Sequence, residues 1–102
     1  MNRVFVFATL KAKGIREQAL GADAYAVRVE RATVRDFYEV FIARGTERWP
    51  TLLPSLGDET EGDVLFVDDY DLSRLDAWET RYQRRPIVTD EFGLAWAYFL
   101  KD

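Results

Sequence analysis

The sequence predicts an α+β fold, a small mixed, mostly antiparallel β-barrel of about six strands with one or two short flanking helices. Hydrophobic residues make up 48% of the chain and aromatic residues 15%, a composition that suits a packed core rich in strands. Short runs of β-branched and aromatic residues follow one another mostly without a helical connector, which favours antiparallel neighbours. Because 102 residues contain no repeat, linker or low-complexity tract, we expect a single domain over residues 1–102.

The first part of the chain alternates between strand and turn signals. Residues Arg3–Leu10, RVFVFATL, form an apolar run that predicts a strand buried on both faces. Ile15–Leu20 predicts one or two helical turns before a glycine. Alternating apolar residues over Tyr25–Val34 predict a half-buried strand, and Asp36–Ala43 predicts another.

A long irregular stretch is expected over Gly45–Gly62. It contains Pro50 and Pro54, and two prolines are incompatible with a regular central strand through Trp49–Pro54. A tryptophan in such a loop either fills the core or forms the wall of a pocket, and the sequence leaves both open for Trp49.

The second half of the chain contains three further strand signals. Gly62–Val67 predicts a buried strand, and Leu94–Leu100 predicts the closing strand of the barrel. Between them, Arg85–Asp90 predicts a strand whose Pro86 must lie at an edge or at the strand start. Glu91–Gly93 predicts a tight turn before the last strand.

A helix is predicted over Asp71–Arg85, with the Asp71 carboxylate as its N-cap. At 3.6 residues per turn, four side chains share one face of this helix: Leu72, Leu75, Glu79 and Tyr82. Glu79 is the exception in an apolar stripe, and burial of a carboxylate raises its pKa toward values useful for acid/base chemistry. The structural alternative is a Glu79 that bends to solvent or pairs with Arg81, Arg84 or Arg85.

Composition excludes several classes of function. A net charge of −4 argues against a nucleic acid or an anionic membrane as partner. The absence of Cys and His excludes thiol nucleophiles, zinc sites built on thiolate or imidazole, and Ser-His-Asp arrangements. The apolar run Val4–Leu10 is too short to cross a bilayer, so we expect a cytoplasmic protein. Any acid/base group must be Asp, Glu, Tyr or Lys.

Four segments resemble the γ-glutamylcyclotransferase-like (AIG2-like) family. Residues 4–14, VFVFATLKAKG, are similar to its first strand and loop, and residues 49–54, WPTLLP, to its aromatic-Pro-x-Leu-x-Pro segment. Residues 62–89 resemble its glycine-led strand, LDxxE helix and Tyr-x-Arg strand. Residues 94–100, LAWAYFL, resemble its closing strand. The four occur in the family's order and cover nearly the whole chain.

The resemblance implies a barrel with a cavity at one end and no cofactor or metal. Glu79 holds the position of the family's catalytic acid/base. The implied substrate is a small γ-glutamyl amine or amino acid, whose own α-amine attacks its γ-amide carbonyl to give 5-oxoproline and a free amine. The implied binding residues are those of the first loop, whose backbone would hold the substrate α-carboxylate: Phe7, Ala8, Thr9 and Leu10. Tyr82 is placed to hydrogen-bond Glu79 or the substrate.

The chain departs from the family pattern at three positions. Phe7 and Ala8 replace Tyr-Gly, and Thr80 replaces a Gly. An alanine at positive φ costs roughly 1 kcal/mol. Phe7 and Ala8 favour one alternative, a non-catalytic small-ligand-binding module on the same barrel. A further alternative is an interaction protein that is recognised through the Trp49–Pro54 loop or an edge strand at Pro86.

Overall fold

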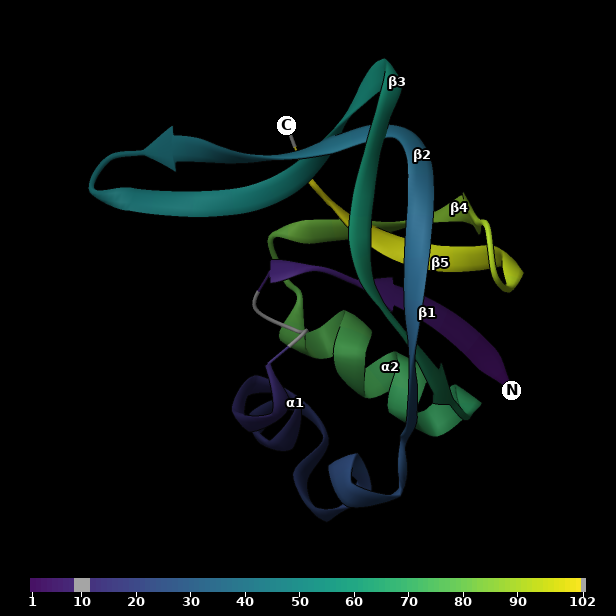
Figure 1. Ribbon diagram of the computed structural model, residues 1–102. Helices are drawn as coiled ribbons and strands as arrows, with labels where there is room; N and C mark the ends of the chain where they lie inside the picture. The colour runs from purple at the N-terminus through teal and green to yellow at the C-terminus, as the bar shows by residue number, and fades with distance from the viewer. Residues whose placement is uncertain (9–11, 102) are drawn as a thin grey trace.

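The computed structural model describes residues 1–8 and 12–101, which form a closed barrel flanked by helices (Figure 1). The barrel order is β1-β3-β2-β4-β5. All neighbouring strands are antiparallel except β1 and β5, which are parallel. The elements in chain order are β1 (Asn2–Val6), α1 (Lys13–Leu20), the 3-10 helix η2 (Gly21–Ala26), β2 (Arg28–Arg44), β3 (Glu47–Val67), α2 (Asp69–Trp78), β4 (Tyr82–Thr89) and β5 (Gly93–Leu100). The predicted fold class is confirmed, with five strands in the described residues in place of about six.

The strand count differs because two predicted strands are one. Asp36 joins them in β2, where its positive φ of 65° shifts the register between Arg35 and Phe37. The Asp36 carboxylate accepts a hydrogen bond from the Gly57 N–H at 2.9 Å, which fixes the bend against β3. The predicted strand start at Tyr25 is wrong, because this residue lies in η2 and the strand begins at Arg28.

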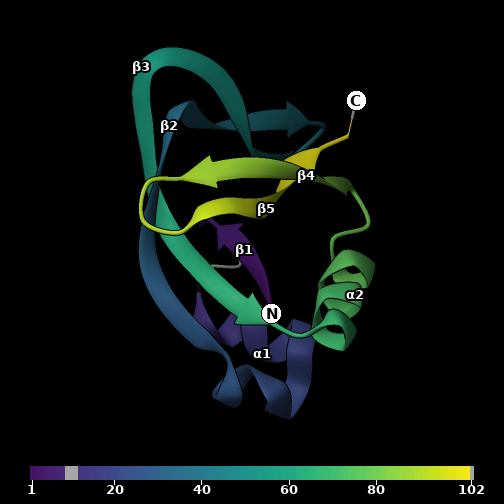
Figure 2. The ribbon, with the colours of Figure 1, turned by 90° about the vertical axis from the view of Figure 1, so that its right-hand side faces the viewer.

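The expectation of an irregular stretch over Gly45–Gly62 is also wrong. Residues 47–67 are one long strand, β3, and Pro50 and Pro54 pair with Phe41 and Phe37 of β2. The prolines are tolerated because this half of β3 pairs, among the described strands, with β2 alone, so its other side is an edge. The outer halves of β2 and β3 form a projecting arm (residues 37–54), seen at the upper left in Figure 1 and pointing away from the viewer in Figure 2.

Helix α2 begins and ends earlier than predicted. Its N-cap is Asp68, whose carboxylate accepts the Asp71 N–H at 2.7 Å, so the predicted cap at Asp71 is wrong. The helix ends at Trp78, and Glu79 is its C-cap with φ −89° and ψ 55°. The predicted continuation to Arg85 is wrong because β4 starts at Tyr82 and pairs with β5 over its whole length.

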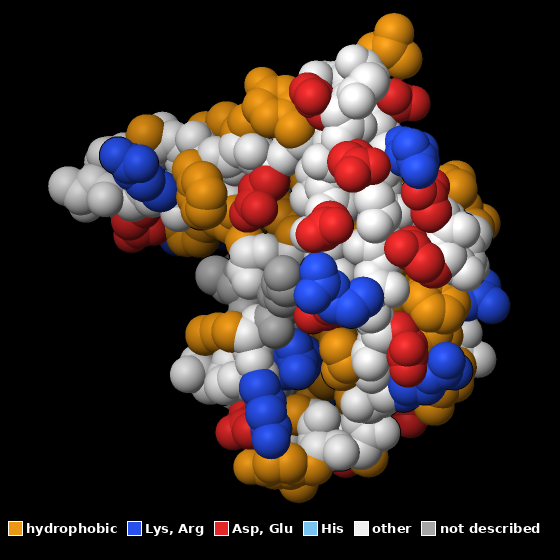
Figure 3. Space-filling view, in the orientation of Figure 1, with side chains coloured by type: hydrophobic (Ala, Val, Ile, Leu, Met, Phe, Trp, Pro, Cys, Tyr) orange, Lys and Arg blue, Asp and Glu red, His pale blue; other side chains and the backbone are white. Residues whose placement is uncertain are grey.

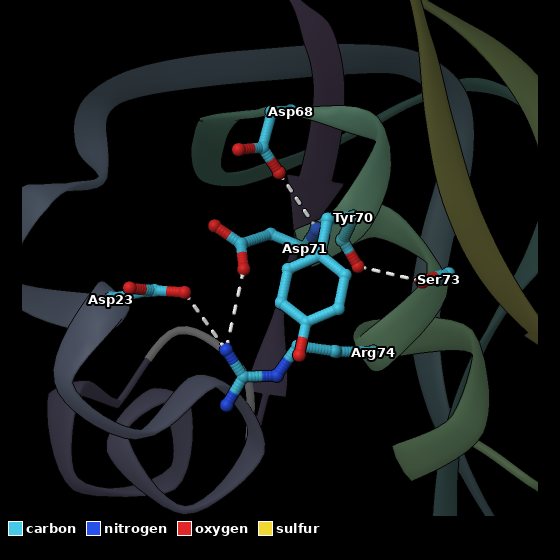
Figure 4. A network of polar contacts seen from close by, with 6 residues as sticks. All are labelled: Asp23, Asp68, Tyr70, Asp71, Ser73 and Arg74. Carbon is cyan, nitrogen blue, oxygen red and sulfur yellow. Dashed lines mark hydrogen bonds and ion pairs between the residues drawn. The ribbon is translucent and has the colours of Figure 1, made fainter.

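Asp71 instead belongs to a polar cluster that joins η2 to α2 (Figure 4). Arg74 donates to Asp23 of η2 at 2.9 Å and to Asp71 at 3.4 Å, and its guanidinium lies 5.5 Å from the centre of the Tyr70 ring. Asp71 is buried, and burial, followed by the negative charges of Asp68 and Asp23, raises its pKa. The cluster therefore anchors the N-terminal half of α2 to η2. It is separate from Glu79, which lies at the C-terminal end of the helix.

Side chains on the two faces of the sheet form two cores. The barrel interior contains Phe5, Phe7, Ala32, Val34, Leu52, Val64, Ile87, Ala95, Ala97 and Phe99. The layer between the sheet and the helices contains Val4, Val6, Ala19, Leu20, Leu65, Val67, Leu72, Leu75 and Tyr98. Successive residues of β1 alternate between the cores, as the pleat of a strand requires. In the described residues, no helix has the length and apolar character needed to cross a membrane.

Gly62 allows β1 to approach β3 closely. A Cβ at this position would lie 2.4 Å from the Val6 carbonyl oxygen and 2.8 Å from the Phe5 ring. Val6 and Phe5 are the last two residues of β1. The absence of a side chain at Gly62 is therefore what lets the end of β1 pack directly against β3. The predicted strand over residues 62–67 is confirmed as the last part of β3.

Candidate active site

A cavity lies at the end of β1 where five segments of the chain meet. It has about 290 Å³ of empty space, including its open mouth. Its lining is mostly apolar and aromatic: Phe5, Val6, Phe7, Pro50, Glu79, Tyr82 and Tyr98. Three residues predicted for the site, Phe7, Glu79 and Tyr82, are therefore brought together, although they come from three places in the fold: directly after β1, the C-cap of α2 and the start of β4.

Glu79 carries the carboxylate of this cavity. Its backbone is anchored on both sides, since its N–H donates to the Leu75 carbonyl at 2.9 Å and its carbonyl accepts the Tyr82 N–H at 3.0 Å. Burial raises the pKa of Glu79 from 4.5 to about 7. Near neutral pH the group therefore exists in both protonation states, as a proton-transferring residue requires.

The three arginines considered as partners of Glu79 contact other groups. Arg81 stacks on the ring of Trp49 at 4.6 Å, Arg84 forms an ion pair with Asp76 at 3.0 Å, and Arg85 lies 5.7 Å from the ring of Phe99. Among the described residues, Glu79 forms neither an ion pair nor a side-chain hydrogen bond. The arginine pairing in the predicted structural alternative is therefore wrong. The other part of that alternative, a Glu79 at the end of the helix that bends to solvent, is met in part, because Glu79 is the C-cap of α2 and its side chain is half-buried.

Two tyrosines supply the polar groups beside Glu79. Burial, followed by the negative charge of Glu79, raises the pKa of Tyr82 to about 12, so its hydroxyl stays protonated. Tyr98 donates its hydroxyl proton to Asp76 at 2.7 Å, and burial together with this bond raises its pKa further. Tyr98 is not among the site residues predicted from the sequence. The sequence signal for this residue is a tyrosine inside the apolar run LAWAYFL, because a hydroxyl buried there needs a hydrogen-bond partner.

The predicted first loop is only partly described. Phe7 is buried and lines the cavity, and Ala8 follows it with a φ of 53°. This positive φ is the conformation that a glycine adopts without strain, as expected for the position. Thr9 and Leu10 lie outside the described residues. Within the described ranges, no group of three or more acidic residues is arranged to hold a metal ion.

Comparison with solved structures shows the same fold in several proteins. A structure named gamma-glutamyl cyclotransferase is 18% identical with a TM-score of 0.76, and the match covers 99% of this chain and 67% of that one. An aig2-like protein from Mus musculus is 21% identical with a TM-score of 0.73, covering 97% of this chain and 76% of that one. A protein from Arabidopsis thaliana is 22% identical with a TM-score of 0.76, covering 99% and 69%.

Comparison at the level of sequence gives two results. No curated protein matches the chain. The family model described as gamma-glutamyl cyclotransferase, AIG2-like, matches residues 4–102, which include every element from β1 to β5 except the first two residues of β1. The chain therefore belongs to the gamma-glutamyl cyclotransferase, AIG2-like family.

Proposed function

We propose that this protein converts a γ-glutamyl amide into 5-oxoproline and a free amine, with Glu79 as the acid/base. The observation that carries the proposal is a carboxylate with a pKa of about 7 in an aromatic-lined cavity. No arginine or lysine of the described residues neutralises it. A structural glutamate would more commonly be solvated or paired, so this environment favours a functional role.

The proposed reaction needs no protein nucleophile. The α-amine of the γ-glutamyl group attacks its own γ-carbonyl carbon, a new C–N bond closes the five-membered ring, and the original amide C–N bond breaks. Glu79 takes the proton that the attacking nitrogen loses and then gives a proton to the leaving amine, so charge and protons balance. One carboxylate performs both steps best when its pKa lies near the working pH.

The rest of the cavity has supporting roles in this proposal. Once a substrate is bound, the protonated hydroxyl of Tyr82 donates a hydrogen bond to Glu79 or to the substrate carbonyl in this proposal. The backbone from Phe7 to Leu10 holds the substrate α-carboxylate, which keeps the folded substrate in its ring-closing pose. The positive φ of Ala8 supports this role, because a strained residue persists where the surrounding structure or a function requires its conformation.

The test is formation of 5-oxoproline from γ-glutamyl amino acids and γ-glutamyl amines, followed by mass spectrometry. We expect product with the wild-type protein and none above background with Glu79→Gln, which keeps the side-chain shape but cannot carry the proton. The matched control is Glu59→Gln, an exposed glutamate in a weak 3.9 Å ion pair on the barrel wall, which should retain activity. Equal product from Glu79→Gln and wild type would overturn the role of Glu79.

A second outcome would favour the non-catalytic alternative. If neither protein forms 5-oxoproline but both bind 5-oxoproline or γ-glutamyl compounds, the cavity is a ligand-binding site without turnover. The observation in favour of this alternative is the loss of a hydroxyl at Phe7, where the family pattern has Tyr.

A further inference from the structure

A second hollow opens beside the candidate active site and shares part of its wall. Its empty space, counted together with the open solvent at its mouth, is about 810 Å³, and it shares Pro50, Glu79 and Tyr82 with the inner cavity. Its other walls come from the projecting arm, from Ile15 of α1, and from the end of α2 with the segment that follows it. Figure 3 shows how the arm overhangs the body of the molecule on this side. A group bound in the inner cavity can therefore extend past Glu79 into this outer hollow.

The outer hollow combines tryptophans with positive charge. Trp49 and Trp78 line it together with Arg48 and Arg81. The Arg81 guanidinium lies 4.6 Å from the centre of the Trp49 ring, a cation–π contact that holds its charge in place. In the described part of the lining, Glu79 is the one acidic residue.

These arginines differ from five others in the described part of the chain. Those five form ion pairs with a described Asp or Glu: Arg28, Arg31, Arg35, Arg74 and Arg84. Neither Arg48 nor Arg81 forms an ion pair with a carboxylate of the described residues, although the protein has a net charge of −4. Their charge is available to a ligand that enters the hollow.

This arrangement specifies the chemistry of the group that leaves. In the proposed reaction the leaving amine is bonded to the carbonyl beside Glu79, so the rest of that amine occupies the outer hollow. A guanidinium favours a carboxylate through charge-assisted hydrogen bonds, and tryptophan rings favour apolar or aromatic side chains. Two arginines repel a leaving group that ends in an ammonium.

We infer that the outer hollow binds the leaving group of the substrate and selects an α-amino acid with a large apolar side chain, with Arg81 as the partner of its α-carboxylate. This inference rests on the proposed function for its placement of the leaving amine. Arg48 adds positive charge at the same opening. The reaction then releases 5-oxoproline and a free apolar amino acid, and its atoms balance as described above.

The experiment compares two substrates that differ by one carboxylate, γ-glutamylphenylalanine and γ-glutamyl-2-phenylethylamine. We expect the wild-type kcat/KM for 5-oxoproline formation to be about tenfold or more higher for the first, as a charge-assisted contact implies. In Arg81→Gln the ratio should fall close to one. Arg85→Gln is the matched control, because this exposed arginine also lies against an aromatic ring but lines a different hollow, and it should keep the wild-type ratio.

The outcomes separate this inference from the proposed function. Turnover of both compounds with a ratio near one in the wild type overturns the leaving-group assignment and leaves the cyclisation intact. If there is no turnover, binding of the two compounds is measured through the fluorescence of the three tryptophans, two of which, Trp49 and Trp78, line the hollow. A preference for the carboxylated compound that disappears in Arg81→Gln supports the subsite without the reaction, and equal binding overturns the subsite.

Discussion

Replacing Glu79 by Gln should change how the stability of the protein depends on pH. Burial raises the pKa of Glu79 from 4.5 to about 7, so the folded protein binds this proton more tightly than the unfolded chain. As pH rises from 4.5 to 7, the unfolded chain releases the proton first, and the folded state becomes less stable. The destabilisation caused by the buried, ionised carboxylate is absent below about pH 4.5 and complete above about pH 7. Gln carries no charge, so the variant is not destabilised in this way.

The size of the effect follows from the two pKa values. The interval between 4.5 and about 7 corresponds to about 3.4 kcal/mol, at 1.36 kcal/mol for each pH unit. Glu79 is only partly buried at the cavity, so water screens its charge, and we expect about 1–2 kcal/mol in practice. The difference in free energy of unfolding between Glu79→Gln and wild type should therefore increase by about 1–2 kcal/mol in favour of the variant as the pH is raised from 5 to 8.

The assay is urea unfolding followed by the fluorescence of the three tryptophans, at pH 5 and pH 8. Wild type, Glu79→Gln and the surface control Glu59→Gln are measured in parallel. The control should show no such gain, because its side chain is 54% exposed. A stability difference between Glu79→Gln and wild type that is the same at both pH values would refute the reasoning, since it would mean that Glu79 ionises as it does in the unfolded chain.

Three further substitutions test the local geometry by thermal or urea unfolding. Ala8→Gly should stabilise the protein by about 1 kcal/mol by relieving the strain of an alanine at φ 53°, and a loss of stability would show that this residue is unstrained. Gly62→Ala should destabilise it by about 1–3 kcal/mol, because the new methyl group meets a backbone carbonyl of β1 at 2.4 Å. Gly14→Ala, which meets nothing within 4 Å, is its control and should not destabilise the protein. Tyr98→Phe should cost about 1 kcal/mol through loss of the hydrogen bond to Asp76, and an unchanged midpoint would contradict that contribution.

The sequence predicted the barrel because its apolar runs have the length and composition of buried strands. The segments over residues 62–67 and 94–100 are strands of the barrel wall in which most residues are buried, so their apolar character leaves little choice of structure. The arm was missed because Pro50 and Pro54 argue against a strand in the interior of a sheet, and sequence alone does not reveal that this half of β3 is an edge.

The limits of α2 could not be predicted for a different reason. The segment DDYD offers three aspartates as caps, and local propensity does not distinguish Asp68 from Asp71. The end of the helix is decided by the pairing of Tyr82 with Leu100, a contact distant in sequence. Glu79 and Tyr82 do not share a helix face as predicted, yet both line the cavity, because β4 brings the tyrosine back beside the helix end.

The measurement that most directly tests the proposed role of Glu79 is the pH dependence of kcat/KM for 5-oxoproline formation between pH 5.5 and pH 8.5. The attacking amine needs an ionised base, so activity should fall as pH drops through an apparent pKa near 7, the value that burial gives Glu79. A profile that is flat over this range, or whose acidic limb lies near the ordinary glutamate pKa of 4.5, would contradict the assignment of Glu79 as the acid/base.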